Sequence, residues 1–245
     1  MNTESPVAIV TGASRGIGAA IARRLAHDGH AVVVNYAGRT ADAEALVAQI
    51  EQDGGRAIAV QADVADAGAA ARLFDAAEAA YGAVDVLVNN AGIMRLARLA
   101  DSDDALFDSQ VAVNLKGTFN TLREAARRLR DGGRIVNLSS SVVGLYQPTY
   151  GVYAATKAGV QALTHVLAKE LRGRRITVNT VAPGPTATDL FLDGKPQELV
   201  DQLARLAPLE RLGQPDDIAG VVAFLAGPDG AWVNGQTLRA NGGIV

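Results

Sequence analysis

The chain of 245 residues contains no cysteine. This absence excludes disulfides, thiolate catalysis and cysteine-based metal sites. Histidine is also scarce, with three scattered residues, His27, His30 and His165. We therefore expect no bound transition metal.

Neither a strong charge of one sign nor a long apolar run is present. The formal net charge of -3 gives no indication of binding to nucleic acid or to an acidic membrane. No apolar run reaches the length of a membrane span. Residues 1–6 are polar and lack the apolar segment of a signal peptide, so we expect a cytoplasmic location.

Short apolar runs instead alternate with helical patterns along the whole chain. The runs predict strands at residues 7–10, 31–34, 57–60, 84–88, 134–138, 176–181 and 235–239. Helices are expected at about 17–27, 41–52, 67–81, 103–130, 150–171 and 215–225. This alternation predicts an α/β protein with a doubly wound parallel sheet of about seven strands, covered on both faces. We expect one domain over residues 1–245, with a loop and a short helix at about 184–212 that serve the substrate.

A glycine-rich segment, Thr11–Gly18, follows the first strand and opens the first helix. Its glycines at 12, 16 and 18 form a G-x-x-x-G-x-G pattern rather than G-x-G-x-x-G. Glycine lets the backbone turn tightly and approach a pyrophosphate at the start of a helix. The order of strand, loop and helix favours a dinucleotide site over a turn without a ligand.

Tyr153 and Lys157 are four residues apart on a predicted helix, which places the phenol and the ammonium on one face. A free tyrosine has a pKa of about 10, and a nearby cation lowers that pKa. A serine such as Ser140 could donate to the same substrate oxygen. The pattern alone is weak, because many amphipathic helices place a surface lysine beside a half-buried tyrosine by chance.

Several motifs in order strengthen this interpretation: Thr11–Gly18, Asn89–Gly92, Asn114, Ser140 with Tyr153 and Lys157, and Pro183–Thr188. Together they resemble the short-chain dehydrogenase/reductase family over essentially the whole chain, and in general pattern the 3-oxoacyl-acyl-carrier-protein reductases. The resemblance implies a Rossmann fold and hydride transfer between a nicotinamide and a carbonyl/alcohol pair.

The resemblance also implies a role for each of four catalytic residues. Tyr153 acts as general acid for reduction or general base for oxidation. Lys157 lowers the pKa of Tyr153 and bonds the nicotinamide ribose, and Ser140 polarises the carbonyl. Asn114 orders a water that links Lys157 to solvent, although an asparagine inside a helix can also cause a local kink.

Three adjacent serines, Ser139 to Ser141, compete for the serine role. Ser140 lies thirteen residues before Tyr153, as the family's serine usually does, and is the second of a pair that ends the fifth strand. Ser141 directly precedes a Val-Val-Gly segment that also resembles the family's pattern. Side chains alternate along a strand, so Ser139 and Ser141 would point away from Ser140. We assign Ser140.

The cofactor is expected to be NADP(H), with use of NAD(H) left open. The segment after the second strand has no acidic residue to bind a ribose 2′-hydroxyl, whereas Arg15 and Arg39 could bind a 2′-phosphate or be merely solvated. Asp63 could accept the adenine amino group or cap the next helix. The expected cofactor residues are Gly12, Ser14, Arg15, Gly16, Ile17, Gly18, Asn35, Tyr36, Arg39, Asp63, Val64, Asn90, Ala91, Gly92, Tyr153, Lys157, Pro183, Gly184, Thr186 and Thr188.

The substrate is harder to predict. An apolar pocket is expected from Val142, Leu145, Tyr146, Tyr150, Leu190 and Phe191, although each could simply pack the loops. The substrate could be a 3-oxoacyl thioester or a simple ketone, aldehyde or sugar. Arg172, Arg174 and Arg175 could dock an acidic acyl carrier protein, but Asp131 stands where carrier-protein reductases tend to place a basic residue.

Two further expectations concern the class of protein and its assembly. A catalytically silent NADP-binding regulator on the same fold is the alternative to an enzyme. The intact set of Asn114, Ser140, Tyr153 and Lys157 argues against a regulator. The family resemblance implies a homotetramer built on the helices near 103–130 and 153–171.

Overall fold

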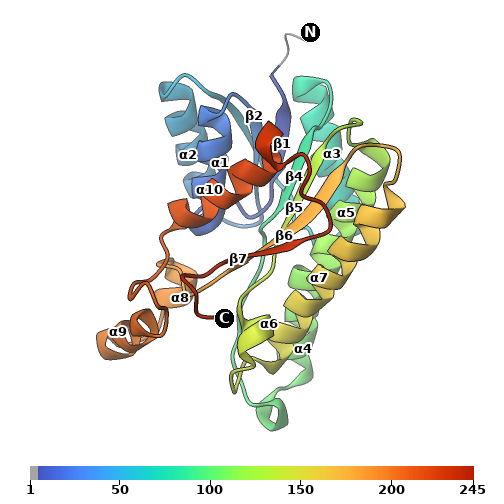
Figure 1. Cartoon of the computed structure of the whole chain (residues 1–245). Helices are drawn as coiled ribbons and strands as arrows, with labels where there is room; N and C mark the ends of the chain where they lie inside the picture. Colours follow the sequence, from blue (N-terminus) through green and yellow to red (C-terminus); the bar gives the residue numbers. More distant parts are fainter. Residues whose placement is uncertain (1–4) are drawn as a thin grey trace.

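The computed structural model describes residues 5–245 and is built on one seven-stranded parallel sheet (Figure 1). The strand order is β3-β2-β1-β4-β5-β6-β7, and every neighbouring pair is parallel. The predicted doubly wound sheet is therefore confirmed. The strands are β1 (Val7–Val10), β2 (Ala31–Tyr36), β3 (Arg56–Gln61), β4 (Val86–Asn89), β5 (Arg134–Leu138), β6 (Thr177–Pro183) and β7 (Thr237–Ala240).

Six long helices form the two outer layers. On one side lie α1 (Gly16–His27), α2 (Thr40–Gln52) and α10 (Pro215–Ala226), and on the other lie α3 (Ala67–Tyr81), α5 (Gly117–Arg128) and α7 (Gly151–Glu170) (Figure 1). Each layer has its own apolar core. Successive β1 residues divide between the two, with Ala8 and Val10 packed in one core and Ile9 in the other. This alternation is what buries a parallel strand on both faces.

The helix expected at 103–130 is interrupted. It consists of α4 (Asp104–Gln110), a wider turn of π-helix (η2, Val111–Lys116) and α5. Asn114 lies inside the π-helical turn. Such turns often mark functional sites, because one extra residue re-aims the side chains that follow.

Other boundaries also differ from the predictions. Strand β2 continues through Asn35 and Tyr36, two residues beyond the expected end. Residues 184–212 hold two short helices, α8 (Asp189–Leu192) and α9 (Gln197–Arg205), in place of one. The remaining elements are α6 (Val142–Leu145), η1 (Leu99–Asp101) and η3 (Pro228–Gly230). From residue 5 onward, none of the helices has the length and apolarity to cross a membrane.

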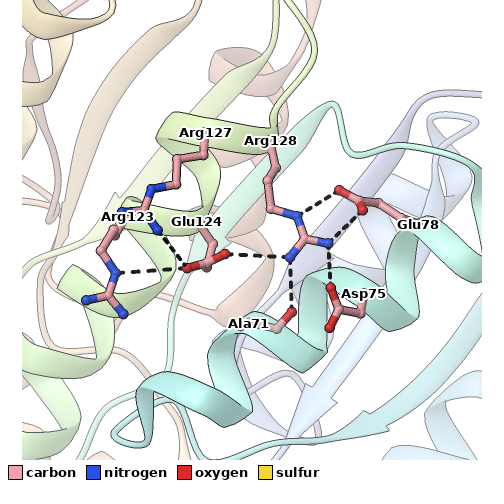
Figure 2. Close-up of polar contacts among 7 residues, drawn as sticks. All are labelled: Ala71, Asp75, Glu78, Arg123, Glu124, Arg127 and Arg128. Atoms are coloured by element: carbon pink, nitrogen blue, oxygen red, sulfur yellow. Dashed lines mark hydrogen bonds and ion pairs between the residues drawn. The ribbon is translucent and has the colours of Figure 1, made fainter.

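An ionic cluster fixes α5 against α3 (Figure 2). Arg128 donates to both carboxylate oxygens of Glu78, at 2.9 and 2.6 Å, to Asp75 at 2.7 Å and to the carbonyl of Ala71 at 3.3 Å. Glu124 lies 3.5 Å from the same guanidinium. The hydrogen bonds to Glu78 raise the pKa of Arg128 above its ordinary value. A bidentate ion pair between arginine and a carboxylate holds the two side chains in a defined geometry.

Replacing Arg128 with Ala should lower the free energy of unfolding by about 1–3 kcal/mol, because Glu78 and Glu124 would lose their main partner. Chemical denaturation with urea measures this change. Arg127→Ala is the matched control, since Arg127 is two-thirds exposed and, within residues 5–245, pairs only with Glu124, at 3.8 Å. The control should cost less than about 0.5 kcal/mol. Equal losses for the two variants would contradict the role given to Arg128.

Candidate active site

The carboxyl ends of β1, β4, β5 and β6 meet at one edge of the sheet, where the strand order reverses between β1 and β4. Ligands of open parallel sheets bind in the crevice at such a switch point. The glycine loop follows β1, Asn90 follows β4, Ser140 follows β5, and Pro183 ends β6. The sheet therefore brings the separate motifs of the sequence to one place.

The glycine loop is held against the loop that follows β4. Asn90 donates from Nδ2 to the carbonyls of Thr11 and Gly12, both at 3.0 Å, and the Thr11 hydroxyl accepts from the backbone N–H groups of Asn90 and Ala91. A Cβ on Gly12 would lie 2.8 Å from the Cα of Ala91, and one on Gly18 would lie 2.5 Å from Asn90 Nδ2. Larger residues at 12 and 18 would push the two loops apart.

The residues of this cavity fit a dinucleotide. Within residues 5–245, no side chain caps the start of α1, and the first residues of this helix, Gly16 to Gly18, line the cavity. A phosphate group satisfies the N–H groups at the start of a helix and the helix dipole together. The cavity is lined by Gly12, Ser14, Arg15, Gly16, Ile17, Gly18, Asn35, Ala37, Gly38, Arg39, Ala62, Asp63, Val64, Asn90, Ala91, Gly92, Ile93, Val113, Ala187, Thr188, Asp189 and Leu190.

Fourteen of the twenty expected cofactor residues line this cavity. Five others line the adjoining cavity described below: Tyr153, Lys157, Pro183, Gly184 and Thr186. Tyr36 is buried and does not line the cavity, since β2 continues through it. Asn35 lines the cavity but is buried, and it accepts from the N–H of Gly12 and donates to the carbonyl of Ala62 at 2.9 Å. Its amide thus braces the glycine loop against the end of β3.

Asp63 does not cap the next helix, as one alternative held. Asp66 is the N-cap of α3 and accepts from Ala69 N–H at 2.9 Å, which helps to lower the pKa of Asp66. Asp63 instead accepts from the N–H of Ala65 at 3.0 Å and lines the cofactor cavity.

Helix α7 carries Tyr153 and Lys157 into a second cavity, which adjoins the first. The two cavities share Ile17, Asn90, Gly92, Thr188 and Leu190. Lys157 Nζ donates to the carbonyl of Leu138 at 2.9 Å and lies 5.7 Å from the centre of the Tyr153 ring. The phenol of Tyr153 is hydrogen-bonded to the side chain of Ser140, so Tyr153, Lys157 and Ser140 form one cluster.

The pKa values of this cluster differ from the expected direction. Removal from water raises the pKa of Tyr153 to about 12, although the hydrogen bond to Ser140 opposes the rise. Burial lowers the pKa of Lys157 to about 8. The expectation that Lys157 would bring the Tyr153 pKa below its ordinary value is wrong for this structure, because desolvation is the larger effect. The phenol is therefore protonated at neutral pH, and it can transfer its proton to an alkoxide, which is a stronger base than the phenolate.

Asn114 is fully buried, and its side chain holds the loop after β4. Its Oδ1 accepts from the N–H of Ile93 at 2.8 Å, while Nδ2 donates to the Ile93 carbonyl at 2.9 Å and to the Thr156 hydroxyl at 3.2 Å. Asn114 therefore joins this loop to α7 beside Lys157. The water relay expected of Asn114 stays a prediction.

The three serines have different partners. Ser139 donates to the carbonyl of Lys157 at 3.1 Å and accepts from Gln161, and Ser141 donates to the carbonyl of Ala182 and accepts from Asn241. Both are buried and brace the fold. Ser140 faces Tyr153 and is partly exposed to the cavity.

The second cavity is mostly apolar and contains five of the six expected substrate residues: Val142, Leu145, Tyr150, Leu190 and Phe191. Tyr146 is the exception, because it ends α6 with a left-handed backbone and leaves its side chain 81% exposed. Sequence reasoning missed Met94, Gln147, Pro185, Leu203, Leu206 and Ile244. Leu203 lies on α9 and shares an amphipathic pattern with Leu199 and Leu206, a signal that a loop interpretation of 184–212 overlooks.

Comparison with known proteins agrees with this geometry. A family model described as enoyl-(acyl carrier protein) reductase matches residues 12–245. A short-chain type dehydrogenase/reductase of Picea abies is 48% identical, with 98% of this chain and 92% of the relative covered. The chain belongs to the short-chain dehydrogenase/reductase family.

Further relatives of this short-chain dehydrogenase/reductase carry more specific names. An NADPH-dependent aldehyde reductase-like protein of Arabidopsis thaliana is 47% identical, with 98% of this chain and 94% of the relative covered. A short-chain dehydrogenase from Burkholderia cenocepacia, solved in complex with NADP, is 41% identical with a TM-score of 0.93, and covers 100% of this chain and 99% of its own.

The serine assignment can be tested by three single substitutions. Ser140→Ala should lower oxidoreductase turnover about 100-fold, the loss typical of removing one donor to a developing oxyanion, and should cost little stability, because Ser140 is partly exposed and accepts one long hydrogen bond, from the N–H of Val142 at 3.3 Å. Ser139→Ala and Ser141→Ala should keep most of the turnover and lose about 1 kcal/mol of stability through their buried hydrogen bonds. Initial rates and urea denaturation measure the two effects. A loss of turnover in either control as large as that of Ser140→Ala would show that the assignment is wrong.

Proposed function

We propose that this protein is an NADPH-dependent reductase that converts a ketone or an aldehyde to an alcohol. The observation that carries the proposal is the position of the Tyr153 phenol, which is bonded to Ser140 in an apolar cavity that adjoins the glycine-loop cavity. A carbonyl held there would meet a proton donor on one side and the cofactor cavity on the other.

The chemistry divides between the cofactor and the chain. A bound NADPH would supply the hydride to the carbonyl carbon. The Ser140 hydroxyl would donate a hydrogen bond to the carbonyl oxygen, and Tyr153 would transfer its proton to that oxygen as negative charge develops. Lys157, held by the Leu138 carbonyl, would stabilise the phenolate left behind.

Arg15 and Arg39 support NADPH over NADH. Both line the cofactor cavity beyond the end of β2, and the segment that joins β2 to Arg39 has no acidic side chain. A carboxylate in this segment would bind a ribose 2′-hydroxyl and repel a 2′-phosphate. The Arabidopsis relative is named as NADPH-dependent, and the Burkholderia structure contains NADP.

A free carbonyl compound is favoured over an acyl group on a carrier protein. Arg174 is one of the three arginines that could dock a carrier protein. It donates hydrogen bonds to Asp131, at 2.9 Å, and to the carbonyl of Ala126. Arg172 and Arg175 follow the end of α7, whereas Tyr153 and Lys157 lie near its start (Figure 1). The twenty residues of α7 extend for about 30 Å, so this basic group is remote from the cavity.

A 3-oxoacyl thioester remains the second candidate, because a 3-oxoacyl-acyl-carrier-protein reductase of Staphylococcus aureus is 45% identical, with 97% of both chains covered. The mostly apolar second cavity would also accept a short acyl chain. Small thioesters therefore belong in the substrate test.

We also propose a homotetramer. A tetramer with three two-fold axes needs at least two different self-complementary surfaces. Phe107, Phe119 and Val166 are about half-exposed on α4, α5 and α7. Phe224 on α10, in the helix layer on the other face of the sheet, is 40% exposed, and Trp232, in the segment between η3 and the edge strand β7, is 98% exposed. These two apolar surfaces could supply the two interfaces.

The function can be tested with purified protein and a panel of aldehydes, ketones, quinones, keto-sugars and acetoacetyl-CoA, each with NADPH and with NADH. We expect NADPH oxidation with aldehydes or ketones and a lower kcat/KM with NADH. Tyr153→Phe should lower turnover at least 100-fold, because the proton donor is lost, while the Kd for NADPH stays within about twofold.

Each unfavourable result has a separate meaning. Turnover of acetoacetyl-CoA alone would favour the thioester candidate. Tight NADPH binding without turnover of any carbonyl would favour the regulatory alternative. Unchanged turnover by Tyr153→Phe would refute the proton-transfer role of this residue.

Light scattering after size-exclusion chromatography should report about four times the 25.3 kDa mass of the chain. Trp232→Ser should reduce the particle to a dimer, because it removes the most exposed aromatic side chain of one surface. If the unmodified protein is a monomer, the proposed tetramer is wrong. If Trp232→Ser is still a tetramer, the surface that contains Trp232 and Phe224 does not form one of the interfaces.

A further inference from the structure

Asp189, at the start of α8, reaches from the substrate loop to the glycine loop. Its Oδ2 lies 3.2 Å from Nη1 of Arg15. Both side chains line the cofactor cavity, and with Arg39 they also line the cleft beside it. An ion pair therefore crosses the cavity at the arginine to which a 2′-phosphate would bind.

The other charged groups that line this cleft are Arg39, Lys195 and Asp193, and within residues 5–245 none of them pairs with Arg15. Arg39 pairs with Asp42 on its own helix, with Nη1 and Oδ2 3.2 Å apart. Lys195 turns back to the carbonyl of Phe191 and stacks 4.7 Å from the Phe191 ring. Asp193 also lines the cleft, but no interaction of its side chain is found within residues 5–245. Asp189 is thus the acid that contacts Arg15.

We propose that Asp189 is a cofactor-selectivity residue that competes with the 2′-phosphate of NADPH for Arg15. This inference rests on the proposed use of NADPH. The guanidinium Nη1 that meets Asp189 is the kind of donor that binds phosphate, so the phosphate must displace the carboxylate or share its partner. The carboxylate is 78% exposed and can turn into solvent when it is displaced.

The sign of the effect follows from the charges. Asp189 weakens NADPH binding, because it lowers the positive charge that Arg15 offers and adds a negative charge near the phosphate. NADH has a 2′-hydroxyl in place of the phosphate, so its affinity does not depend on this competition. Asp189 therefore narrows the preference of the protein for NADPH over NADH.

The substrate loop takes part in the same competition. Thr188, the N-cap of α8, accepts from the N–H of Phe191, and Leu190 lines both cavities. When the phosphate takes Arg15, the loop loses its ionic contact with the glycine loop. The choice of cofactor is in this way linked to how the substrate loop is held.

The experiment measures the Kd of NADPH and of NADH by fluorescence titration at one low ionic strength. Asp189→Asn keeps the shape of the side chain and removes its charge. It should lower the Kd of NADPH about threefold to fivefold and leave the Kd of NADH unchanged, as expected for one exposed ion pair. Asp193→Asn is the matched control, since it removes the same charge from the same cleft without touching Arg15.

Combining Asp189→Asn with Arg15→Ala tests whether Asp189 changes the affinity for NADPH through Arg15. The gain in NADPH affinity should disappear in the Arg15→Ala background, because the competition requires the guanidinium. A gain that persists there, a gain of equal size in Asp193→Asn, or equal gains for both cofactors would overturn the proposal.

The outcome for the unmodified protein separates the two levels of inference. If the unmodified protein binds NADPH no more tightly than NADH, the proposed cofactor is wrong. The proposed competition between Asp189 and the 2′-phosphate is then wrong as well. If the unmodified protein prefers NADPH and Asp189→Asn leaves that Kd unchanged, the competition alone is wrong.

Discussion

A chain of buried hydrogen bonds below the active site fixes the position of α7. Asn89 on β4 donates to Asn137 on β5 at 2.8 Å, and Asn137 donates to the Thr164 hydroxyl of α7 at 2.8 Å. Thr180 on β6 and Thr121 on α5 add bonds at 2.8 and 2.6 Å. Removing one partner from such a network leaves another polar group buried and unsatisfied, at a cost of about 1–3 kcal/mol. The network therefore admits few rotations of α7 against the sheet.

That restriction determines the chemistry of the site. Lys157, Val160, Thr164 and Leu167 form one buried stripe on α7, so fixing Thr164 also fixes Lys157 two turns away. The Leu138 carbonyl then receives the ammonium at 2.9 Å, and Tyr153 one turn earlier meets Ser140. The same packing that positions Tyr153 and Lys157 also removes them from water. This loss of water disfavours both charged forms, raising the pKa of Tyr153 and lowering that of Lys157.

Much of this arrangement could be predicted from the sequence, because it depends on local patterns. The glycine spacing after β1 and the apolar runs of the strands determine the edge at which the motifs meet. The choice of Ser140 followed from its spacing of thirteen residues to Tyr153 and its place as the second of a serine pair, and in the structure Ser139 and Ser141 hydrogen-bond to other partners. These inferences required only neighbouring residues and the direction of the strands.

Other features required contacts between distant segments. The sequence indicated that Lys157 would lower the Tyr153 pKa, because spacing reveals the distance between two groups but not their loss of water. The sequence predicted Tyr146 in the pocket because its neighbours in the chain were expected there. In the structure, the left-handed backbone at the end of α6 directs the Tyr146 side chain to the surface. Ile244 enters the pocket only because the segment after β7 returns to α6, where Asn241 bonds to Ser141 at 3.0 Å.

The same long-range packing places the cofactor cavity and the second cavity side by side. Thr188 and Leu190 line both cavities, and a Cβ on Gly16 would come within 3.4 Å of the Thr188 methyl group. The substrate loop is therefore packed on the glycine loop as well as on the substrate cavity. A ligand that shifted the glycine loop would change the wall of the second cavity, and by linkage a substrate that reordered this wall would change the affinity for the cofactor by the same factor. Such an effect would pass through Thr188 and Leu190, because these two residues of the substrate loop line both cavities and Thr188 also packs on Gly16.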